Sequence, residues 1–118
     1  MLNSKCKIAV VDKKGKYFFL FQGFRKNKFS ISGLETVMSV TSEEMTNYNI
    51  FFMVLYEYRD VFELLKFRDS DIPAIIASEN VKIVKKLQKL NCYPVVDLSK
   101  RNTIHTSLHD CMNEFIKK

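Results

Sequence analysis

The run Ile50–Tyr56, with the sequence Ile-Phe-Phe-Met-Val-Leu-Tyr, limits the fold more than any other stretch of the chain. It carries no charge and is bounded by Asn49 before it and Glu57 after it. A strand with one solvated face would alternate apolar and polar side chains, and this run does not. We therefore expect a short strand that is buried on both faces, as in a parallel sheet covered by helices above and below.

Strand patterns and helix patterns alternate along the rest of the chain. Four further short apolar runs are predicted strands: Lys7–Val11, Phe29–Ser32, Pro73–Ala77 and Tyr93–Asp97. Pro94 lies inside the last run and favours an edge position, because proline has no backbone N–H to donate. A helical pattern follows each strand, and this alternation predicts a parallel sheet with right-handed crossovers. The expected fold is α/β and flavodoxin-like, a three-layer sandwich with five strands in the order 2-1-3-4-5.

The segment from Lys16 to Asn27 is the first predicted helix. Its apolar side chains recur at the spacing of one helical face, which consists of Tyr17, Leu20, Phe21 and Phe24. Phe18 and Phe19 add more apolar surface than a surface helix needs, so a strand over Tyr17–Phe21 remains an open alternative. We expect these aromatic side chains to pack on the sheet rather than to stack on nucleic-acid bases.

Four more helices are predicted from caps and apolar stripes. Thr41 and Glu44 have capping-box spacing within a helix between Leu34 and Tyr48, and residues 60 and 63 have the same spacing. The next helix is capped by residue 78 or 80, and the last begins at Thr103. The side chains expected to face the core are Val37, Met38, Met45, Val61, Leu64, Leu65, Ile83, Val84, Leu87, Leu90, Ile104, Leu108, Met112, Phe115 and Ile116.

The composition indicates one globular domain over residues 1–118, with 47% hydrophobic residues and a formal net charge of +6. The lysines are spread along the whole chain, which favours a solubilising surface over an anion site. Cys6, Cys92 and Cys111 have no disulfide spacing, so we expect free thiols in a reducing compartment. The N-terminal residues lack a signal peptide's apolar core, and no stretch approaches the roughly 20 apolar residues that cross a bilayer. We expect a cytoplasmic protein with no membrane partner.

Ligands of open parallel sheets bind outside the carboxyl ends of the strands, where the strand order reverses. In this order that point lies between the first and third strands. The segments to examine are therefore residues 12–16 and 56–60, followed by Ser78 and residues 97–101.

At these positions the chain resembles the receiver domain of two-component response regulators. Ile8–Asp12 looks like the family's first strand and the acidic residues after it. Residues 48–55 and Asp60–Lys66 resemble the third strand and the helix that follows. Ile72–Ser78 resembles the fourth strand with its terminal hydroxyl residue. The resemblance extends over nearly the whole chain and implies a CheY-like fold and a role in signal transduction.

The same resemblance implies a degenerate phosphorylation pocket. Asp12 and Ser78 match the family's residues, whereas Lys13 stands where a second acidic residue would help to hold Mg²⁺. The position of the phosphoacceptor Asp falls on Met53 or Val54, and neither side chain can accept a phosphoryl group.

Lys100 and Glu57 are the two other candidate residues of the receiver pocket. Lys100 follows the last strand, but it comes two or three residues later than the family's Lys-Pro pair. Glu57 would become an acceptor only if the third strand shifted by three residues, which would put side chains on the wrong face.

A pocket with Asp12 as its single acid, crowded by Lys13, Lys14 and Lys16, would repel the Mg²⁺ that aspartyl phosphate formation needs. We expect Asp12 to pair with Lys13 or a neighbouring lysine, so that a fixed cation replaces the metal. The resemblance then implies a pseudo-receiver that is not an enzyme and holds no cofactor or metal. Its expected partner is a sensor kinase, another regulator or a second copy of the chain.

The expected docking face is made by the fourth predicted helix, the last strand and the last helix, a surface that receivers commonly use. Its side chains are Lys82, Lys85, Lys86, Lys89, Tyr93 and His105. Two other classes remain open, namely a basic adaptor that binds nucleic acid, which we favour less, and a small flavodoxin-like enzyme. The loop Lys13–Lys16 lacks the glycine pattern of a phosphate-binding loop, and His105 and His109 have no evident third metal ligand.

Overall fold

The computed structural model of the chain describes residues 6–24, 28–36, 40–67, 72–90 and 93–116. Its centre is a five-stranded sheet in which every pair of neighbouring strands is parallel, in the order β2-β1-β3-β4-β5. The strands are β1 (Cys6–Val11), β2 (Phe29–Leu34), β3 (Ile50–Leu55), β4 (Ala74–Ser78) and β5 (Val95–Asp97). The predicted α/β class, flavodoxin-like topology and strand order are confirmed.

The middle strand β3 is buried along its whole length, as its sequence predicts. It pairs with β1 on one side, where Val11 lies opposite Met53, and with β4 on the other, where Leu55 lies opposite Ser78. Successive side chains of β3 enter the two apolar layers on opposite faces of the sheet. This two-sided burial is why the strand tolerates no polar residue.

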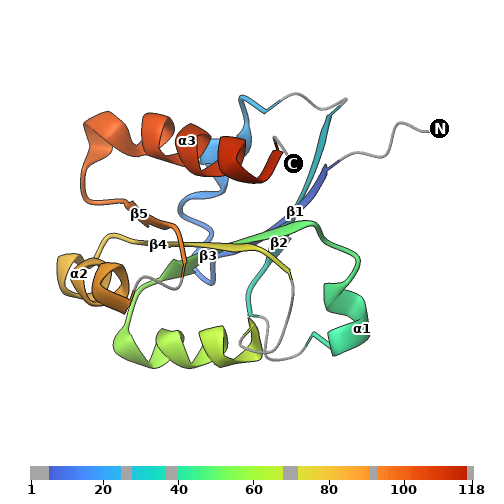
Figure 1. The fold of residues 1–118 in the computed structure, drawn as a ribbon, viewed down its shortest axis with the longest axis horizontal. Helices are drawn as coiled ribbons and strands as arrows, with labels where there is room; N and C mark the ends of the chain where they lie inside the picture. Colours follow the sequence, from blue (N-terminus) through green and yellow to red (C-terminus); the bar gives the residue numbers. More distant parts are fainter. Residues whose placement is uncertain (1–5, 25–27, 37–39, 68–71, 91–92, 117–118) are drawn as a thin grey trace.

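Helical elements cover both faces of the sheet (Figure 1). One face is covered by the 3-10 helix η1 (Phe18–Phe21) and the helix α3 (Ile104–Ile116). The other face is covered by α1 (Ser42–Met45), the 3-10 helix η2 (Tyr58–Phe67) and α2 (Val81–Leu90). The carboxyl ends of the strands therefore lie at an edge of the sheet between the two helical layers.

The helix predicted over residues 16–27 is wrong, and so is the alternative strand over Tyr17–Phe21, because in the described residues 16–24 the regular structure is the short η1. The Asp12 carboxylate accepts a hydrogen bond from the Tyr17 amide, and Gly15 has a left-handed φ of 64°. The chain is thus held in a tight turn directly before η1. The predicted apolar face is nevertheless confirmed, with three buried residues and one half-buried: Tyr17, Leu20, Phe21 and Phe24.

The helix caps of α1 and α2 are formed by side chains that the sequence predicts. The Glu44 amide donates a hydrogen bond to the Thr41 hydroxyl, and the Thr41 amide donates to the Glu44 carboxylate, which completes the capping box of α1. Asn80, rather than Ser78, caps α2, since its Oδ1 accepts a hydrogen bond of 3.0 Å from the Lys82 amide.

The capping box predicted for Asp60 and Glu63 is wrong. The helix η2 begins two residues before Asp60, whose carboxylate accepts hydrogen bonds from the preceding amides of Tyr56 and Glu57. The Glu63 carboxylate accepts a hydrogen bond from the Thr36 hydroxyl, which ties η2 to the segment after β2.

Most of the predicted core residues are buried. Those with described side chains and little exposure are Met45, Leu64, Ile83, Val84, Leu87, Ile104, Leu108 and Met112. Val61 is half-buried, whereas Leu90 is 64% exposed and its assignment to the core is wrong. Val37 and Met38 lie outside the described residues, as do the side chains of Leu65, Phe115 and Ile116.

Three further expectations concern element ends, cysteines and membrane spans. β5 begins at Val95 and not at Tyr93, but it lies at the sheet edge as predicted. Cys6 is a free, half-buried thiol whose pKa is raised by burial, Cys111 is half-buried, and Cys92 lies outside the described residues. Within the described ranges, no helix is long and apolar enough to cross a membrane.

The substitution Phe52→Ala tests the central position of β3. Phe52 is fully buried, and its ring meets the Phe21 ring edge-on with 5.1 Å between centroids. The resulting cavity should lower the free energy of unfolding by about 3–5 kcal/mol, measured by urea unfolding. Phe62→Ala is the matched control, because Phe62 is 66% exposed on η2, and it should change that free energy by less than about 0.5 kcal/mol. Equal losses in the two variants would contradict this architecture.

Candidate functional site

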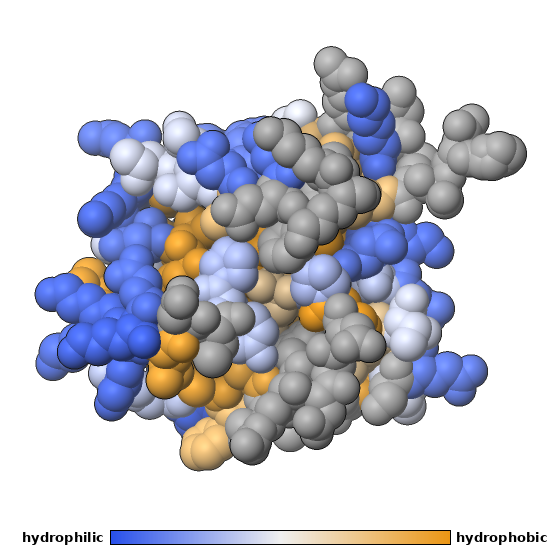
Figure 2. Space-filling model, viewed as in Figure 1, coloured by the Kyte–Doolittle hydropathy of each residue, from blue (hydrophilic) through white to orange (hydrophobic). Residues whose placement is uncertain are grey.

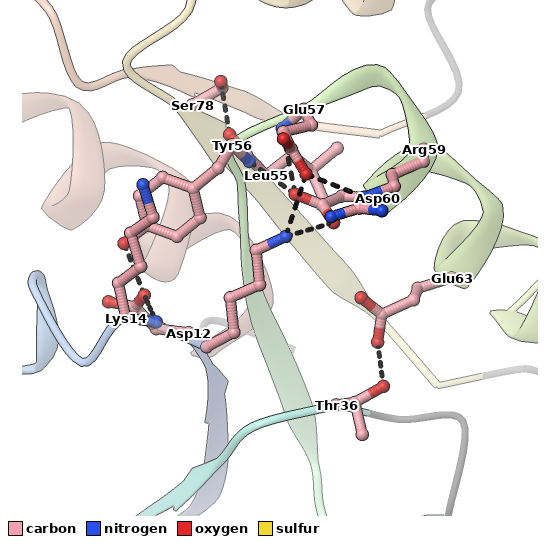
Figure 3. Close-up of polar contacts among 11 residues, drawn as sticks. Asp12, Lys14, Thr36, Leu55, Tyr56, Glu57, Arg59, Asp60, Glu63 and Ser78 are labelled. Carbon is pink, nitrogen blue, oxygen red and sulfur yellow. Dashed lines mark hydrogen bonds and ion pairs between the residues drawn. The ribbon is translucent and has the colours of Figure 1, made fainter.

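Polar side chains gather at the carboxyl ends of the central strands (Figure 3). Asp12 and Lys13 follow β1, Tyr56 and Glu57 follow β3, and Ser78 ends β4. Because parallel strands bring their carboxyl ends to the same edge of a sheet, residues far apart in sequence meet here. This edge is the candidate site.

Asp12 is buried, and each oxygen of its carboxylate accepts hydrogen bonds from the chain itself. Oδ1 accepts from the Tyr56 hydroxyl at 2.5 Å and from the Lys14 amide at 3.1 Å. Oδ2 accepts from the Tyr17 amide at 2.8 Å, and the Asp12 carbonyl accepts from the Gly15 amide at 3.0 Å. Asp12 therefore organises the loop between β1 and η1.

Tyr56 directly follows β3 and lies beside Asp12. The Lys14 ammonium lies 4.7 Å from the centroid of its ring, a cation–π contact. Burial, followed by the hydrogen bond to Asp12, raises the pKa of the Tyr56 phenol well above its usual range, so the hydroxyl stays a donor. Met53 and Val54, where the resemblance places the phosphoacceptor, lie inside β3 and are buried, short of the strand end.

The expected pairing of Asp12 with a lysine ammonium is wrong. The Lys13 ammonium instead lies 2.8 Å from Asp60 Oδ1 and 3.4 Å from Glu57 Oε2 (Figure 3). Glu57 also accepts a hydrogen bond from Arg59 Nε at 2.8 Å. The hydrogen bond to Asp60 raises the pKa of Lys13, and the contacts with Arg59 and then Lys13 lower the pKa of Glu57. A fixed cation thus joins two acidic side chains that follow β3.

Asp60 holds the turn that follows β3. Its Oδ2 accepts hydrogen bonds from the amides of Tyr56 at 2.8 Å and Glu57 at 2.9 Å, while Oδ1 faces Lys13. Burial alone would raise the pKa of Asp60, but the Lys13 ammonium and the two amides outweigh burial and lower it. The sequence analysis assigned Asp60 to a helix cap and missed this role. The available signal was the position of Asp60, four residues beyond the end of the apolar run Ile50–Tyr56.

Ser78 and Lys100, the other two residues of the expected receiver pocket, do not join the Asp12 network. The Ser78 hydroxyl is fully buried, donates to the Leu55 carbonyl at 2.6 Å and accepts from the Asn80 amide at 3.0 Å. Lys100 is exposed in the turn after β5, and in the described part of the chain no hydrogen bond or ion pair links its side chain to Asp12 or Ser78. Ser78 therefore connects two strands.

Glu79 forms a second polar cluster, which the sequence analysis missed. Its Oε2 lies 2.9 Å from the Lys16 ammonium and accepts a hydrogen bond of 2.5 Å from the Tyr17 hydroxyl. Contacts with Tyr17 and then Lys16 lower the pKa of Glu79, while burial and the Glu79 contact raise the pKa of Tyr17 to about 12. This cluster ties the loop after β1 to the end of β4.

The residues of the predicted docking face lie on both sides of the β5 edge. Four of them are exposed lysines of α2, over which hydrophilic side chains gather at the left of Figure 2: Lys82, Lys85, Lys86 and Lys89. His105 is exposed on α3, which covers the opposite face of the sheet. Tyr93 is half-buried just before β5 and packs against the core under α2.

The donor set at this edge does not fit Mg²⁺. The metal takes oxygen ligands and usually more than one carboxylate, whereas the Lys13 ammonium stands between the acidic groups and the amides fix Asp12 and Asp60. No group of three or more His, Cys, Asp or Glu side chains that could hold a metal occurs among the residues that the structure describes. His109 stacks on the Phe24 ring with 5.3 Å between centroids, in a packing role.

No protein-family model, curated protein or solved structure matches this chain. The fold class of the protein is therefore assigned from the topology of its sheet. Five parallel strands in the order 2-1-3-4-5, with helices on both faces, make it a flavodoxin-like α/β protein. That fold hosts several unrelated functions, so the function has to be argued from the site.

The substitution Asp60→Asn tests the ion pair with Lys13. The folded-state pKa of Asp60 is lowered, so its carboxylate stabilises the fold above the ordinary pKa of 3.8, and this contribution is lost as the pH falls through the folded value. At pH 7 the variant should lose about 1–3 kcal/mol of unfolding free energy, because a buried acceptor of several hydrogen bonds is weakened. The difference between wild type and variant should shrink below about pH 4. Urea unfolding across this pH range measures it.

Glu57→Gln is the control for Asp60→Asn. Glu57 contacts the same lysine but is exposed, so its loss should change stability much less at every pH. A difference between wild type and Asp60→Asn that stays constant from neutral to acidic pH would contradict the assignment of a charged Asp60.

Proposed function

We propose that this chain is a receiver-like signalling domain that accepts no phosphoryl group and works by binding another protein rather than by catalysis. The observation that carries the proposal is the closed polar network formed by Asp12, Tyr56, Lys13 and Asp60 at the carboxyl edge of the sheet. The receiver resemblance of the sequence and the flavodoxin-like strand order are consistent with this class.

Aspartyl phosphate formation needs a carboxylate that is free to attack and a divalent cation that neutralises the developing charge. The Asp12 oxygens are engaged by a phenol and two amides, and Asp60 by two amides and an ammonium. An approaching phosphoryl group would have to displace these donors. The phenol of Tyr56 also takes up space beside Asp12. These contacts support a domain in which the network is permanent and not a phosphorylation switch.

A permanent network implies that the signal passes through a surface. The four exposed lysines of α2 make this helix surface positively charged, and α2 packs beside the short edge strand β5. Charge complementarity favours an acidic partner surface and accelerates its association. The proposed partner is a sensor kinase, another regulator or a second copy of the chain, bound through the face of α2, β5 and α3.

The two alternative classes receive less support from the site. A flavodoxin-type enzyme would bind a cofactor phosphate on backbone amides of the loop after β1. In this chain the amides of Lys14, Gly15 and Tyr17 all donate to Asp12. A nucleic-acid adaptor would use the lysines of α2, and a steep fall of affinity for RNA or DNA with salt would be its signature.

Incubation with acetyl phosphate and Mg²⁺, followed by intact-protein mass spectrometry, tests the loss of phosphorylation. We expect no added phosphoryl group, because no carboxylate at the edge is free of donors. An active receiver domain in the same reaction is the positive control. Stoichiometric phosphorylation of Asp12, Glu57 or Asp60 would overturn the proposal.

The docking face is tested with the double substitution Lys82→Glu and Lys86→Glu. Reversing two charges of α2 should weaken binding to the sensor kinase or regulator encoded nearest to this chain by about tenfold or more, measured by isothermal titration calorimetry. Sedimentation velocity of the wild type and the double variant measures whether the same face mediates self-association.

The matched control for the docking test reverses Lys7 and Lys28, two exposed residues at the amino ends of β1 and β2. This control should keep the affinity within about twofold, because these lysines lie at the opposite edge of the sheet from β5. Equal weakening by both double variants would show that net charge, and not the α2 face, determines binding.

A further inference from the structure

A pocket separate from the Asp12 network opens between η1 and the beginning of α3, with a volume of about 260 Å³. Its walls come from the loop after β1 and from the connection that runs from β5 through the 3-10 turn η3 (Arg101–Thr103) into α3. The pocket therefore joins two segments whose nearest lining residues, Leu20 and Leu98, are 78 positions apart in the chain. The buried lining residues Tyr17, Leu20, Leu98 and Ile104 also belong to the apolar layer that covers one face of β3.

The floor and one wall of the pocket are apolar. Leu20, Leu98 and Ile104 form the floor and are almost fully buried. Tyr17 and Phe19 form an aromatic wall, with stacked rings whose centroids are 6.4 Å apart. Phe19 remains 51% exposed, although covering an aromatic side chain of this kind is worth roughly 1.5–3 kcal/mol. The wall offers a surface for a flat apolar group.

The remaining lining residues carry nitrogen groups that can donate hydrogen bonds, and no acidic residue among those that the structure describes lines the pocket. Lys16 is partly neutralised by its ion pair with Glu79. Arg101 is exposed and has no ion pair with an acidic residue in the described ranges, and it is close enough to Tyr17 for its charge to act on the phenol. His105 completes the rim from α3. Together these groups offer hydrogen-bond donors and positive charge at the mouth of an apolar hollow.

We propose that this pocket binds a small organic anion that carries one ring-sized apolar group and one carboxylate or phosphate group. The apolar group would lie on the floor of Leu20, Leu98 and Ile104 against the Phe19 ring, and the anionic group would meet Arg101. The volume corresponds to about nine water molecules, which suits a single ring and excludes a dinucleotide. This site is independent of the proposed receiver function, because none of its residues belongs to the Asp12–Lys13–Asp60 contacts except Tyr17 through its backbone amide.

A titration of the ¹⁵N-labelled full chain followed by NMR tests this site, with phenyl phosphate and benzoate as probes. We expect saturable shifts of the amides of residues 16–20 and 98–105 at millimolar concentration. Inorganic phosphate, which lacks the ring, and benzyl alcohol, which lacks the charge, should each bind at least about fivefold more weakly than phenyl phosphate.

Two pairs of matched variants assign the interactions. Arg101→Gln should weaken phenyl phosphate binding by about five- to tenfold, whereas Lys85→Gln removes one exposed positive charge on α2 and should leave it within twofold. Phe19→Ala should weaken it by about threefold or more, whereas Phe62→Ala, at another exposed phenylalanine, should not.

Three results would overturn the proposed site. They are the absence of saturable shifts with both ring-containing anions, equal binding of inorganic phosphate or benzyl alcohol, and equal effects of Arg101→Gln and Lys85→Gln. Because both members of each pair are exposed, unfolding of a variant does not confuse the comparison, and the amide spectrum of each variant verifies its fold.

Discussion

The pairing of β1 with β3 is the constraint on which the rest of the molecule depends. The central residues of both strands are buried, and in their register Val11 lies opposite Met53. β3 therefore extends two residues past the end of β1, and Tyr56 follows at its tip. From there the Tyr56 phenol reaches back to Asp12, while the Tyr56 amide is held by Asp60. The polar network is thus a direct consequence of how far one apolar strand overhangs its neighbour.

The network counteracts the repulsion between the acidic side chains at the carboxyl edge of the sheet. Acidic groups brought together by parallel strands repel one another unless a cation lies among them, and a bound divalent ion is one such cation. Here the cation is the Lys13 ammonium, which contacts Asp60 and Glu57, and the buried Asp12 is held by neutral donors. A covalently attached ammonium cannot dissociate from the protein as a metal ion can. Under the proposed function, this permanence distinguishes the domain from a phosphorylation switch.

The class of fold and the order of strands could be predicted from the sequence because apolar periodicity records burial directly. The uninterrupted run in β3 and the alternation of strand and helix patterns predicted the parallel sheet, and Pro94 predicted an edge position for β5. The complete strand order was the one expected for a flavodoxin-like fold. The helix over residues 16–27 could not be judged in the same way, since the apolar spacing of Tyr17, Leu20 and Phe21 fits a single 3-10 turn as well as a longer helix. The turn before η1 is held by the Asp12 side chain, a contact that apolar spacing does not encode.

The site residues show the same division between local and non-local information. Sequence reasoning placed Asp12, Lys13, Glu57 and Ser78 at the correct edge, but it paired Asp12 with lysine because those residues are adjacent in the chain. Lys13 follows Asp12 directly, yet in the fold it contacts Asp60, 47 positions away, and Asp12 meets Tyr56.

The backbone amides of the loop after β1 donate their hydrogen bonds to Asp12. Its amides turn inward to Asp12, which closes the side that faces β3, and this leaves the side chains of Lys16, Tyr17 and Phe19 directed toward Glu79 and α3. One conformation of the loop after β1 therefore forms both the hydrogen-bond network around Asp12 and a wall of the pocket. A ligand that stiffened the pocket wall would act on the same backbone that holds Asp12, and it could do so without altering any charge in the network.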